Sequence, residues 1–313
     1  MTTITSDPLT QRGLVAAAQA GDERAFRELV GPYERALRLH CYRMLGSLHD
    51  AQDLTQETLL RAWRSLDRFE RRSGVRTWLY RIATNACLDE LERRPRQPQP
   101  TVDPYPDAWL PDDGCAVDPA ARYARREGIE LAFLTAIQRL PGRQRAVLIL
   151  RDVLGWTGAE TAALLDTTVA GANSALQRAR ATIDGALPAQ RVAPGPRVQR
   201  ELLARYVEAF ERTDIDGLVA ILREDAAMTM PPQPAILGAR PVAEWVCGGC
   251  GAVPGTVVAT WVSANGGPAI LWRAATPDGP GRPQRLIIPE ADGDALAALH
   301  TFDARGLPGF GDS

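Results

Sequence analysis

The sequence predicts a multidomain protein in which two all-α domains are followed by an α+β domain. Its 313 residues exceed the length at which a single hydrophobic core stops growing, so we expect more than one domain. Apolar residues recur with helical spacing from Leu9 to Arg94 and again from Ala120 to Leu187. After Arg197, two helical stretches precede several β-branched runs, which is the order expected of an α+β domain.

Breaks in these patterns set the predicted domain boundaries. We assign residues 1–96 to the first helical domain, 97–119 to a linker, 120–188 to the second helical domain and 197–313 to the α+β domain. The linker has no helical periodicity and is rich in proline and acidic residues, which favours an extended chain. In the last domain we expect helices at Val198 to Arg212 and Asp216 to Arg223, and strands at Ala226 to Met230, Thr256 to Ser263, Ala269 to Ala274 and Arg285 to Ile288.

Charge is distributed unevenly along the chain. All 36 basic residues are arginine, and the formal net charge is -2. Residues 1–96 hold 16 Arg against 13 acidic residues and residues 119–191 hold 10 against 6, whereas residues 97–118 and 192–313 are acidic. The slightly negative total therefore does not exclude a DNA-binding protein, because two mildly basic domains lie within it.

The sequence shows no targeting or membrane-spanning segment. The N-terminus lacks an apolar run, and no stretch approaches the roughly 20 apolar residues that cross a bilayer. We therefore expect a cytoplasmic protein with no membrane partner.

The cysteines predict neither a disulfide framework nor a metal site. There are five, an odd number in a chain without an export signal. Cys41 and Cys87 have apolar neighbours and are expected in the core. Cys247 and Cys250 have a redox or half-metal spacing but lack the further ligands that zinc needs. No metal or other cofactor is predicted, and a redox switch at this pair stays open.

A helical segment of the first domain presents an acidic face with one exposed leucine. On a wheel of 100° per residue, the buried side of residues 50–63 is formed by Ala51, Leu54, Thr58, Leu59 and Ala62. The opposite side is formed by Asp50, Asp53, Gln56, Glu57, Arg64 and, among them, Leu60. An apolar residue ringed by polar ones is typical of a docking patch. The alternative is a solvated face with one stray leucine.

The second domain carries the signature of two helices joined by a tight turn. Thr157 and Glu160 have the spacing of a capping box, which starts a helix that ends near Leu165. A second helix covers Thr168 to about Asp184. Its predicted buried stripe is Val169, Ala172, Ala175, Leu176, Ala179 and Ile183, and its outward side is Ala170, Asn173, Ser174, Gln177, Arg178 and Ala181. Small side chains followed by amides and guanidinium groups suit a DNA major groove, whereas an ordinary helical hairpin is the alternative.

These segments resemble the extracytoplasmic-function (ECF) sigma factors of bacterial RNA polymerase. His40 to Trp63 resembles the part of sigma region two whose acidic helix binds the clamp helices of the largest polymerase subunit. Val75 to Leu91 resembles the part that melts and reads the minus-ten element. Leu140 to Arg151, with Gly155-Trp-Thr157 and Asn173 to Arg180, resembles the region-four helix-turn-helix that reads the minus-thirty-five element.

The resemblance implies three sets of binding residues. Polymerase docking is assigned to Asp50, Asp53, Gln56, Glu57 and Leu60. The minus-ten element needs basic groups for phosphates and flat or polar groups for extruded bases, and this role is assigned to Arg71, Arg72, Arg76, Trp78, Tyr80, Arg81 and Asn85. Trp78 is alternatively a core residue. At the minus-thirty-five element, base reading is assigned to Val169, Ala170, Asn173, Ser174 and Gln177, and phosphate binding to Arg143, Arg151, Arg178 and Arg180.

The linker and the last domain resemble those of a sigma subgroup with a C-terminal SnoaL-like domain. The linker bears Trp109-Leu-Pro111, and residues 198–310 resemble the SnoaL-like cone of curved sheet and helices. The linker is either a solvated spacer or an acidic segment whose carboxylates occupy a basic channel of the polymerase. Cones of this kind also house enzymes, which would use Asp225, His300 or Asp303 as a base, but the sequence shows neither a pocket nor a neighbour that tunes such a base.

We therefore predict a sigma factor and not an enzyme. It binds core RNA polymerase and promoter DNA, directs initiation, and carries a C-terminal domain that modulates activity in cis, with an unknown small ligand as one further partner. The first alternative is a one-component regulator whose C-terminal domain senses a ligand, and the second is a SnoaL-like enzyme fused to a DNA-binding module. A polymerase-docking helix favours the sigma factor, because a repressor has no need of one.

Overall fold

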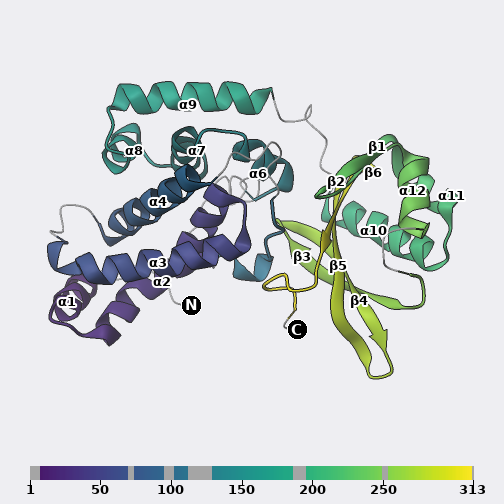
Figure 1. Ribbon diagram of the computed structural model, residues 1–313, viewed down its shortest axis with the longest axis horizontal. Coiled ribbons are helices and arrows are strands. Elements are labelled where there is room, and N and C mark those ends of the chain that lie inside the picture. The colour runs from purple at the N-terminus through teal and green to yellow at the C-terminus, as the bar shows by residue number, and fades with distance from the viewer. Residues whose placement is uncertain are drawn as a thin grey trace. The chain divides into compact units, whose positions relative to one another are not determined.

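The computed structural model describes residues 8–69, 74–94, 102–111, 129–185, 195–248 and 253–311 (Figure 1). Contacts between residues divide the chain into two units. The first comprises Met1–Asp103 and Trp109–Leu187, and the second comprises Pro104–Ala108 and Pro188–Ser313. Five residues from the middle of the sequence thus fold with the C-terminal part of the chain.

Between residues 8 and 94 the described part of the first unit has four helices, α1 (Pro8–Gln19), α2 (Glu23–Leu45), α3 (Leu48–Ser65) and α4 (Val75–Arg93), with a short 3-10 turn η1 (Leu66–Arg68) after α3. The Asp22 side chain accepts hydrogen bonds at the start of α2 and Ser47 does so at the start of α3, so polar caps fix where these helices begin. The core between α2, α3 and α4 includes Tyr42, Leu48 and Leu79, all fully buried.

The second part of the first unit contains α6 (Leu131–Gln138), α7 (Gly142–Leu148), a π-helical turn η4 (Ile149–Val153), α8 (Gly158–Leu164) and α9 (Val169–Asp184). The predicted capping box is confirmed, because the Thr157 hydroxyl and the Glu160 carboxylate exchange hydrogen bonds with each other's backbone N–H. The buried residues of α9 are Ala172, Leu176, Ala179 and Ile183. Val169, which was expected in this stripe, is 46% exposed, because it lies in the first turn of the helix.

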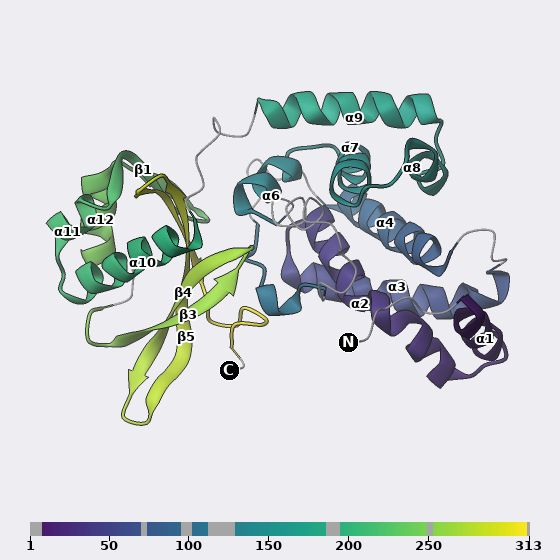
Figure 2. The ribbon, with the colours of Figure 1, turned by 180° about the vertical axis from the view of Figure 1, so that it is seen from behind.

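In its described residues the second unit has a six-stranded sheet and three helices, which confirms the predicted α+β class. The strand order is β2-β1-β6-β5-β4-β3, and all neighbours are antiparallel except β1 and β6. The strands are β1 (Leu222–Met230), β2 (Gln233–Leu237), β3 (Val257–Ala264), β4 (Gly267–Thr276), β5 (Gly279–Asp292) and β6 (Ala295–Asp303). The helices α10 (Pro196–Glu211), α11 (Ile215–Val219) and α12 (Ala239–Gly248) cover one face of the sheet (Figure 2).

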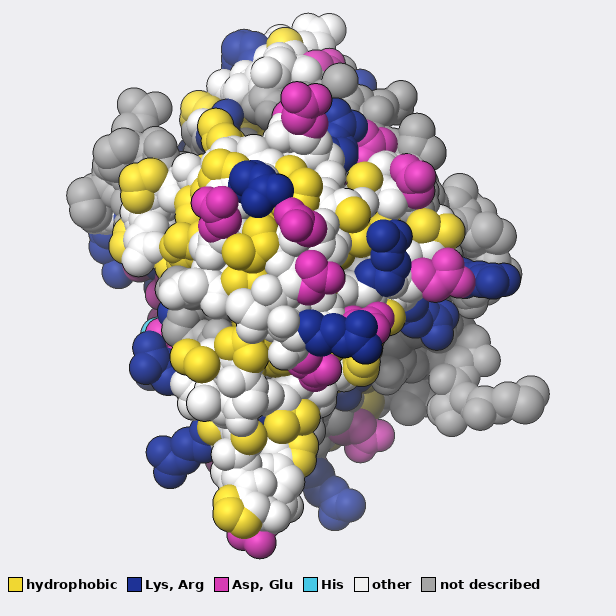
Figure 3. Space-filling view, turned by 90° about the vertical axis from the view of Figure 1, so that its right-hand side faces the viewer, with side chains coloured by type: hydrophobic (Ala, Val, Ile, Leu, Met, Phe, Trp, Pro, Cys, Tyr) yellow, Lys and Arg dark blue, Asp and Glu magenta, His cyan; other side chains and the backbone are white. Residues whose placement is uncertain are grey.

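Apolar side chains fill the space between these helices and the sheet. Phe210 of α10 packs against Trp272 of β4 with ring centroids 4.4 Å apart, and Tyr206 and Val242 are also fully buried there. Figure 3 looks onto the side of this unit that bears α11 and α12, where acidic and arginine side chains are interspersed among apolar ones. The charge of this side is therefore mixed in sign, although the domain as a whole is acidic.

Three details of the second unit differ from the sequence prediction. The helix expected from Asp216 to Arg223 ends at Val219, because Leu222 already pairs with Leu296 of β6. Helix α12 is not among the predicted helices. Strands β2 and β6 are not among the predicted strands. The alanines and leucines of β6 favour a helix locally, and only pairing with β1 and β5 makes this segment a strand. Among the described residues, no helix is long and apolar enough to cross a membrane.

Candidate functional site

The predicted docking helix, α3, exposes one side to solvent as its periodicity indicated. Ala51, Thr58 and Ala62 are buried, whereas Leu60 is 50% exposed. Asp53 and Gln56 are exposed beside it, and Asp50 and Glu57 are half-buried. The predicted buried residues Leu54 and Leu59 are also half-buried. The five predicted docking residues therefore share one accessible face of α3, with a leucine at its centre.

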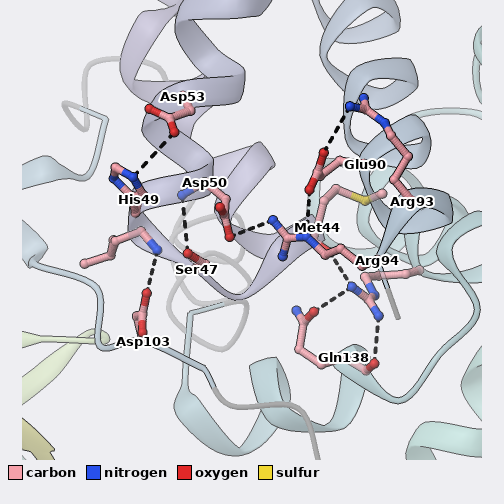
Figure 4. A network of polar contacts seen from close by, with 12 residues as sticks. Met44, Ser47, His49, Asp50, Asp53, Glu90, Arg93, Arg94, Asp103 and Gln138 are labelled. Atoms are coloured by element: carbon pink, nitrogen blue, oxygen red, sulfur yellow. Dashed lines mark hydrogen bonds and ion pairs between the residues drawn. The ribbon is translucent and has the colours of Figure 1, made fainter. Parts of the chain in front are cut away.

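Ion pairs connect this face to α4. The Asp50 carboxylate lies 2.7 Å from Nη2 of Arg94, and Nε of the same arginine lies 2.9 Å from Glu90 (Figure 4). Glu57 accepts a hydrogen bond of 2.8 Å from Arg61, and this interaction lowers the pKa of the Glu57 carboxyl. Asp53 is contacted more loosely, since His49 lies 3.6 Å from it. Asp50 and Glu57 thus already have arginine partners within the protein, whereas Asp53, Gln56 and Leu60 are the more accessible members of the face.

The predicted minus-ten residues on α4 divide into exposed and buried ones. Arg76, Arg81 and Asn85 are exposed. Trp78 is half-buried and stacks on Phe69 with ring centroids 4.8 Å apart. Tyr80 is only 3% exposed. The aromatic residue in the core is therefore Tyr80 in this conformation, not Trp78. Arg71 and Arg72 lie outside the described residues.

The helix-turn-helix packs directly on this part of α4. The Trp156 ring, in the turn before α8, lies 5.5 Å from the Tyr80 ring, and the guanidinium of Arg76 lies over the same indole at 5.5 Å. Nη2 of Arg81 donates to the carbonyl oxygen of Ala163 on α8, 3.0 Å away. We call α6 to α9 the helix-turn-helix lobe, which is expected to read the minus-thirty-five element. Three of the predicted minus-ten residues thus contact this lobe.

A buried arginine reinforces this packing. Arg145 of α7 donates to the carbonyl oxygens of Ile137, Gln138 and Leu140 and to that of Met44 at the end of α2. The Gln138 side chain accepts from Arg145 and donates to the Arg43 carbonyl oxygen at 2.9 Å. Burial lowers the pKa of Arg145 to about 10, which still leaves it charged at neutral pH. The sequence does not indicate this role, because an arginine close to a turn such as Pro141-Gly142 is usually exposed to solvent.

Helix α9 exposes the side chains that are predicted to bind DNA. Val169, Ala170, Asn173, Ser174, Gln177, Arg178 and Arg180 are all exposed, as is Arg143 on α7, while Arg151 is half-buried. A hollow of about 250 Å³ is lined by Arg151, Asn173, Leu176, Gln177 and Arg180. Nη1 of Arg151 is held by the Trp156 carbonyl oxygen at 3.2 Å. The structure therefore brings two predicted phosphate residues, Arg151 and Arg180, to the same hollow as two predicted base readers, Asn173 and Gln177.

Part of the linker has a defined structure of its own. Asp103 folds with the first unit, where its carboxylate accepts from the N–H of Leu48 at 2.8 Å and so caps α3. Burial raises the pKa of Asp103. Residues 104–108 fold with the second unit. The Tyr105 backbone exchanges two 2.9 Å hydrogen bonds with Asn265, in the β3–β4 turn, and the Asp107 carboxylate accepts from Gly266.

The expectation of a solvated spacer is therefore wrong for residues 103–107. Both of the acidic side chains described in this stretch have hydrogen-bond donors in the folded units. Asp112 and Asp113 lie outside the described residues, so the proposal that linker carboxylates enter a polymerase channel rests on them. Nothing in the sequence indicated the contact with the Asn265 turn, because the two segments are far apart along the chain.

The candidate bases of the second unit are each tied to another side chain. Asp225 pairs with Arg223 at 2.8 Å. Hydrogen bonding to Arg305 lowers the pKa of Asp303 to about 2. His300 has neighbours that the sequence did not reveal: its Nδ1 lies 2.9 Å from the Thr229 hydroxyl and its Nε2 lies 2.9 Å from Glu290. These residues come from β1, β5 and β6, which become neighbours only in the sheet.

Two of the three cysteines in the described part of the chain lie in the core, as predicted for Cys41 and Cys87. Cys41 and Cys87 are buried and Cys247 is half-buried, all without a disulfide. Cys250 lies outside the described residues, so the redox hypothesis for this pair stays a prediction. No group of His, Cys, Asp or Glu within the described residues could hold a metal ion.

Comparisons with known proteins identify both helical parts of the first unit. Residues 29–97 match the Sigma-70 region 2 family and residues 130–183 match the Sigma-70 region 4 family. The ECF RNA polymerase sigma factor SigG of Mycobacterium tuberculosis is 43% identical over 280 residues, which cover 81% of this chain and 74% of that protein. The RNA polymerase sigma-H factor of Pseudomonas aeruginosa is 34% identical over 177 residues, which cover 56% of this chain and 92% of that protein.

A solved structure shares the fold over most of the chain. The crystal structure of the ECF sigma factor SigJ of M. tuberculosis aligns with a TM-score of 0.58 and 23% sequence identity, and covers 86% of this chain and 94% of that one. At this identity the similarity shows the fold alone. The alignment with SigJ covers 86% of this chain, whereas the two family matches cover only residues 29–97 and 130–183. The shared fold therefore extends beyond the two matched segments.

Proposed function

Because the chain belongs to the ECF sigma factors of RNA polymerase, we propose that three surfaces of its first unit carry out initiation. The family membership confirms the predicted function: the protein binds core RNA polymerase and directs initiation at specific promoters. It also makes a sigma factor a better description than the alternative of a one-component regulator. The residues that form the three surfaces are our assignment, and we expect them to act in the cytoplasm, where polymerase and promoter DNA meet.

The polymerase-binding surface is the exposed face of α3. The observation that carries this assignment is Leu60, a large apolar side chain that is half exposed on a helix whose opposite side is buried. Binding interfaces often centre on such an apolar anchor with polar residues around it. Asp53 and Gln56 supply the accessible polar rim, while Asp50 and Glu57 add negative charge that their arginine partners reduce.

The DNA-binding surfaces lie on α4 and α9. The names of the two promoter elements place them about 25 base pairs apart, which is roughly 85 Å of B-form DNA. In this conformation, however, Trp156 and Ala163 contact Arg76, Tyr80 and Arg81 on α4. We therefore propose that the helix-turn-helix lobe leaves α4 before the protein engages both elements. The bases of the minus-ten element would then meet Tyr80 and Trp78.

The second unit modulates this activity in cis through the linker. Residues 104–108 are held by the Asn265 and Gly266 turn, whereas Asp103 caps α3 in the first unit. A change in how tightly the turn binds residues 104–108 therefore acts on a segment that is joined through Asp103 to the docking helix α3. A small ligand of the second unit would act by the same route, because it would shift the population of the held and released linker.

We assign the second unit a regulatory and not a catalytic role. Asp225 and Asp303 are paired with arginine, which stabilises the carboxylate and weakens it as a general base. Both ring nitrogens of His300 are engaged by Thr229 and Glu290. The contacts of His300 join side chains of β1, β5 and β6. Thr229, Glu290 and His300 therefore serve the structure of the sheet.

Run-off transcription with core polymerase tests the proposed function. A genomic fragment library serves as template, and transcripts are compared with and without this protein. New, discrete start sites that require the protein are expected. An unchanged transcript pattern, together with no co-purification of core enzyme, would show that the α3, α4 and α9 assignments are wrong.

A further inference from the structure

An acidic side chain holds one of the predicted phosphate-binding arginines in a fixed orientation. Nε of Arg180 on α9 donates to Oδ2 of Asp152 at 2.9 Å, and Nη2 donates to Oδ1 at 2.7 Å. Asp152 lies on η4, 28 residues earlier in the sequence. Both side chains are partly solvent-exposed, so this two-point pair contributes little to stability. Its geometry instead restricts how the Arg180 guanidinium can rotate.

The orientation matters because Arg180 lines the hollow on helix α9. Asn173, Gln177 and Arg180 are spaced by four and three residues on α9, so they lie along one side of the helix. Arg151 of η4 also lines the hollow and is itself held by the Trp156 carbonyl oxygen. Two amides and two restrained guanidinium groups therefore face a space of about 250 Å³.

Charge argues against a phosphate as the partner of Arg180. A phosphate-binding side chain gains most of its affinity from its net positive charge and the counterions it releases, and the Asp152 carboxylate cancels that charge. Guanine offers a neutral edge with two acceptors, O6 and N7, which an arginine fork matches with two N–H donors. An arginine has five such donors, and Asp152 occupies two of them, so three remain.

We propose that Arg180 reads a guanine of the minus-thirty-five element and that Asp152 is the residue that positions it. This inference rests on the proposed DNA-binding role of α9, and it replaces phosphate binding as the role of Arg180. Arg178, which lies two positions earlier on the helix, keeps the phosphate role. Pre-orientation by Asp152 reduces the side-chain entropy that Arg180 loses when it binds the base.

The test is selection of bound DNA by the full-length protein with core polymerase. The probe is a library of duplexes randomised over their whole binding region. The wild type is expected to enrich a motif that contains a guanine preferred roughly tenfold or more over other bases. Arg180→Ala should remove the preference at that position alone. Asp152→Ala should weaken the same preference several-fold, leave the other positions unchanged, and leave the salt dependence of binding unchanged.

Two further variants serve as controls. Arg178→Ala should lower affinity for all sequences and reduce the salt slope by about one. Glu201→Ala removes an equivalent exposed pair with Arg197 on α10 and should change no base preference. Thermal unfolding of the Asp152 and Arg180 variants is expected to match that of the wild type, since the pair is exposed.

Three results would overturn the inference. A uniform loss of affinity with a lower salt slope for Arg180→Ala would make Arg180 a phosphate contact. Tighter binding by Asp152→Ala with an unchanged motif would make Asp152 only a screening charge. Failure of the wild type to enrich any motif for the minus-thirty-five element would refute the proposed role of α9 itself, and the inference with it. The last result is distinguishable, because it appears before any substitution is made.

Discussion

The guanidinium of Arg81 on α4 donates a hydrogen bond to the carbonyl oxygen of Ala163 on α8, 3.0 Å away. The two residues are 82 positions apart in the sequence and belong to lobes assigned to different promoter elements. Their contact means that one lobe occupies part of the surface with which the other is expected to bind DNA. We call the arrangement of the first unit in which α8 contacts α4 closed. Solution experiments can measure how much of the protein adopts it.

Replacing Gln138 by Ala should shift the first unit toward an open arrangement. Gln138 of α6 donates to the Arg43 carbonyl oxygen of α2, so its loss removes a buried hydrogen bond that forms only while these two parts of the first unit stay together. Losing the partner of a buried polar group costs about 1–3 kcal/mol, which corresponds to at least several-fold in the closed-to-open ratio. Energy transfer between dyes on α3 and α9 should fall accordingly. Gln177→Ala, at an exposed glutamine of α9, is the matched control, and equal transfer efficiency in both variants would contradict the prediction.

Replacing Asp53, Glu57 and Leu60 together should abolish binding to core polymerase. Suitable changes are Asp53→Asn, Glu57→Gln and Leu60→Ala, none of which removes a buried side chain. Co-purification with core enzyme measures the loss, and circular dichroism confirms that α3 remains helical. Leu237→Ala removes another exposed leucine, 68% exposed and in the second unit, and should leave binding intact. Retained co-purification of the triple variant would refute the assignment of α3.

The free energy of unfolding should fall below neutral pH because of His40. Burial lowers the pKa of His40 from 6.5 to about 3, and its Nε2 lies 2.9 Å from the Thr84 hydroxyl. The unfolded state therefore binds a proton below about pH 6.5 that the folded state does not, so stability decreases as pH falls from 6.5 toward 3. The contribution is at most about 1.4 kcal/mol per pH unit. Denaturant unfolding at pH 7 and pH 5 measures it.

The control for this titration is His40→Gln. The variant keeps a polar side chain near Thr84 but cannot titrate in this range. The difference between the two pH dependences isolates His40, since other groups cancel. Parallel curves for both proteins would show that His40 is not the group responsible.

Loosening the linker contact should change transcription in the same direction as removing the second unit. Asn265→Gly retains the left-handed backbone of the turn, where Asn265 has a φ of 52°, but loses the oxygen that accepts from the Tyr105 N–H. Asn265→Asp keeps such an oxygen and is the matched control. We expect truncation after Arg191 to leave core binding intact and to change run-off transcription several-fold, with Asn265→Gly changing it in the same direction and Asn265→Asp close to wild type.

Transcription by the truncated chain at the wild-type level would contradict this regulatory role. The comparison should be made with the same core enzyme and template and at equal protein concentration. A change caused by truncation but not by Asn265→Gly would assign regulation to the second unit while removing the linker contact as its route.

Local patterns in the sequence predicted much of the first unit. Helical periodicity places Ala51, Thr58 and Ala62 on one side of α3 and Leu60 on the other, and the structure agrees. The capping box at Thr157 is likewise a local signal, because a helix start depends on residues three positions apart. The strands of the second unit were predicted less completely, since β6 has a helix-favouring composition and becomes a strand only between β1 and β5.

The sequence by itself determined the family, the order of the domains and the outward faces of α3 and α9, because each depends on residues close together in the chain. Only the tertiary structure decided that Tyr80 is buried under Trp156, that Arg145 joins α7 to the end of α2, and that Asp152 restrains Arg180. These contacts join residues that are distant in sequence or that read as solvated charges. Their energies depend on burial and on partner geometry, and no periodicity or spacing encodes either of these.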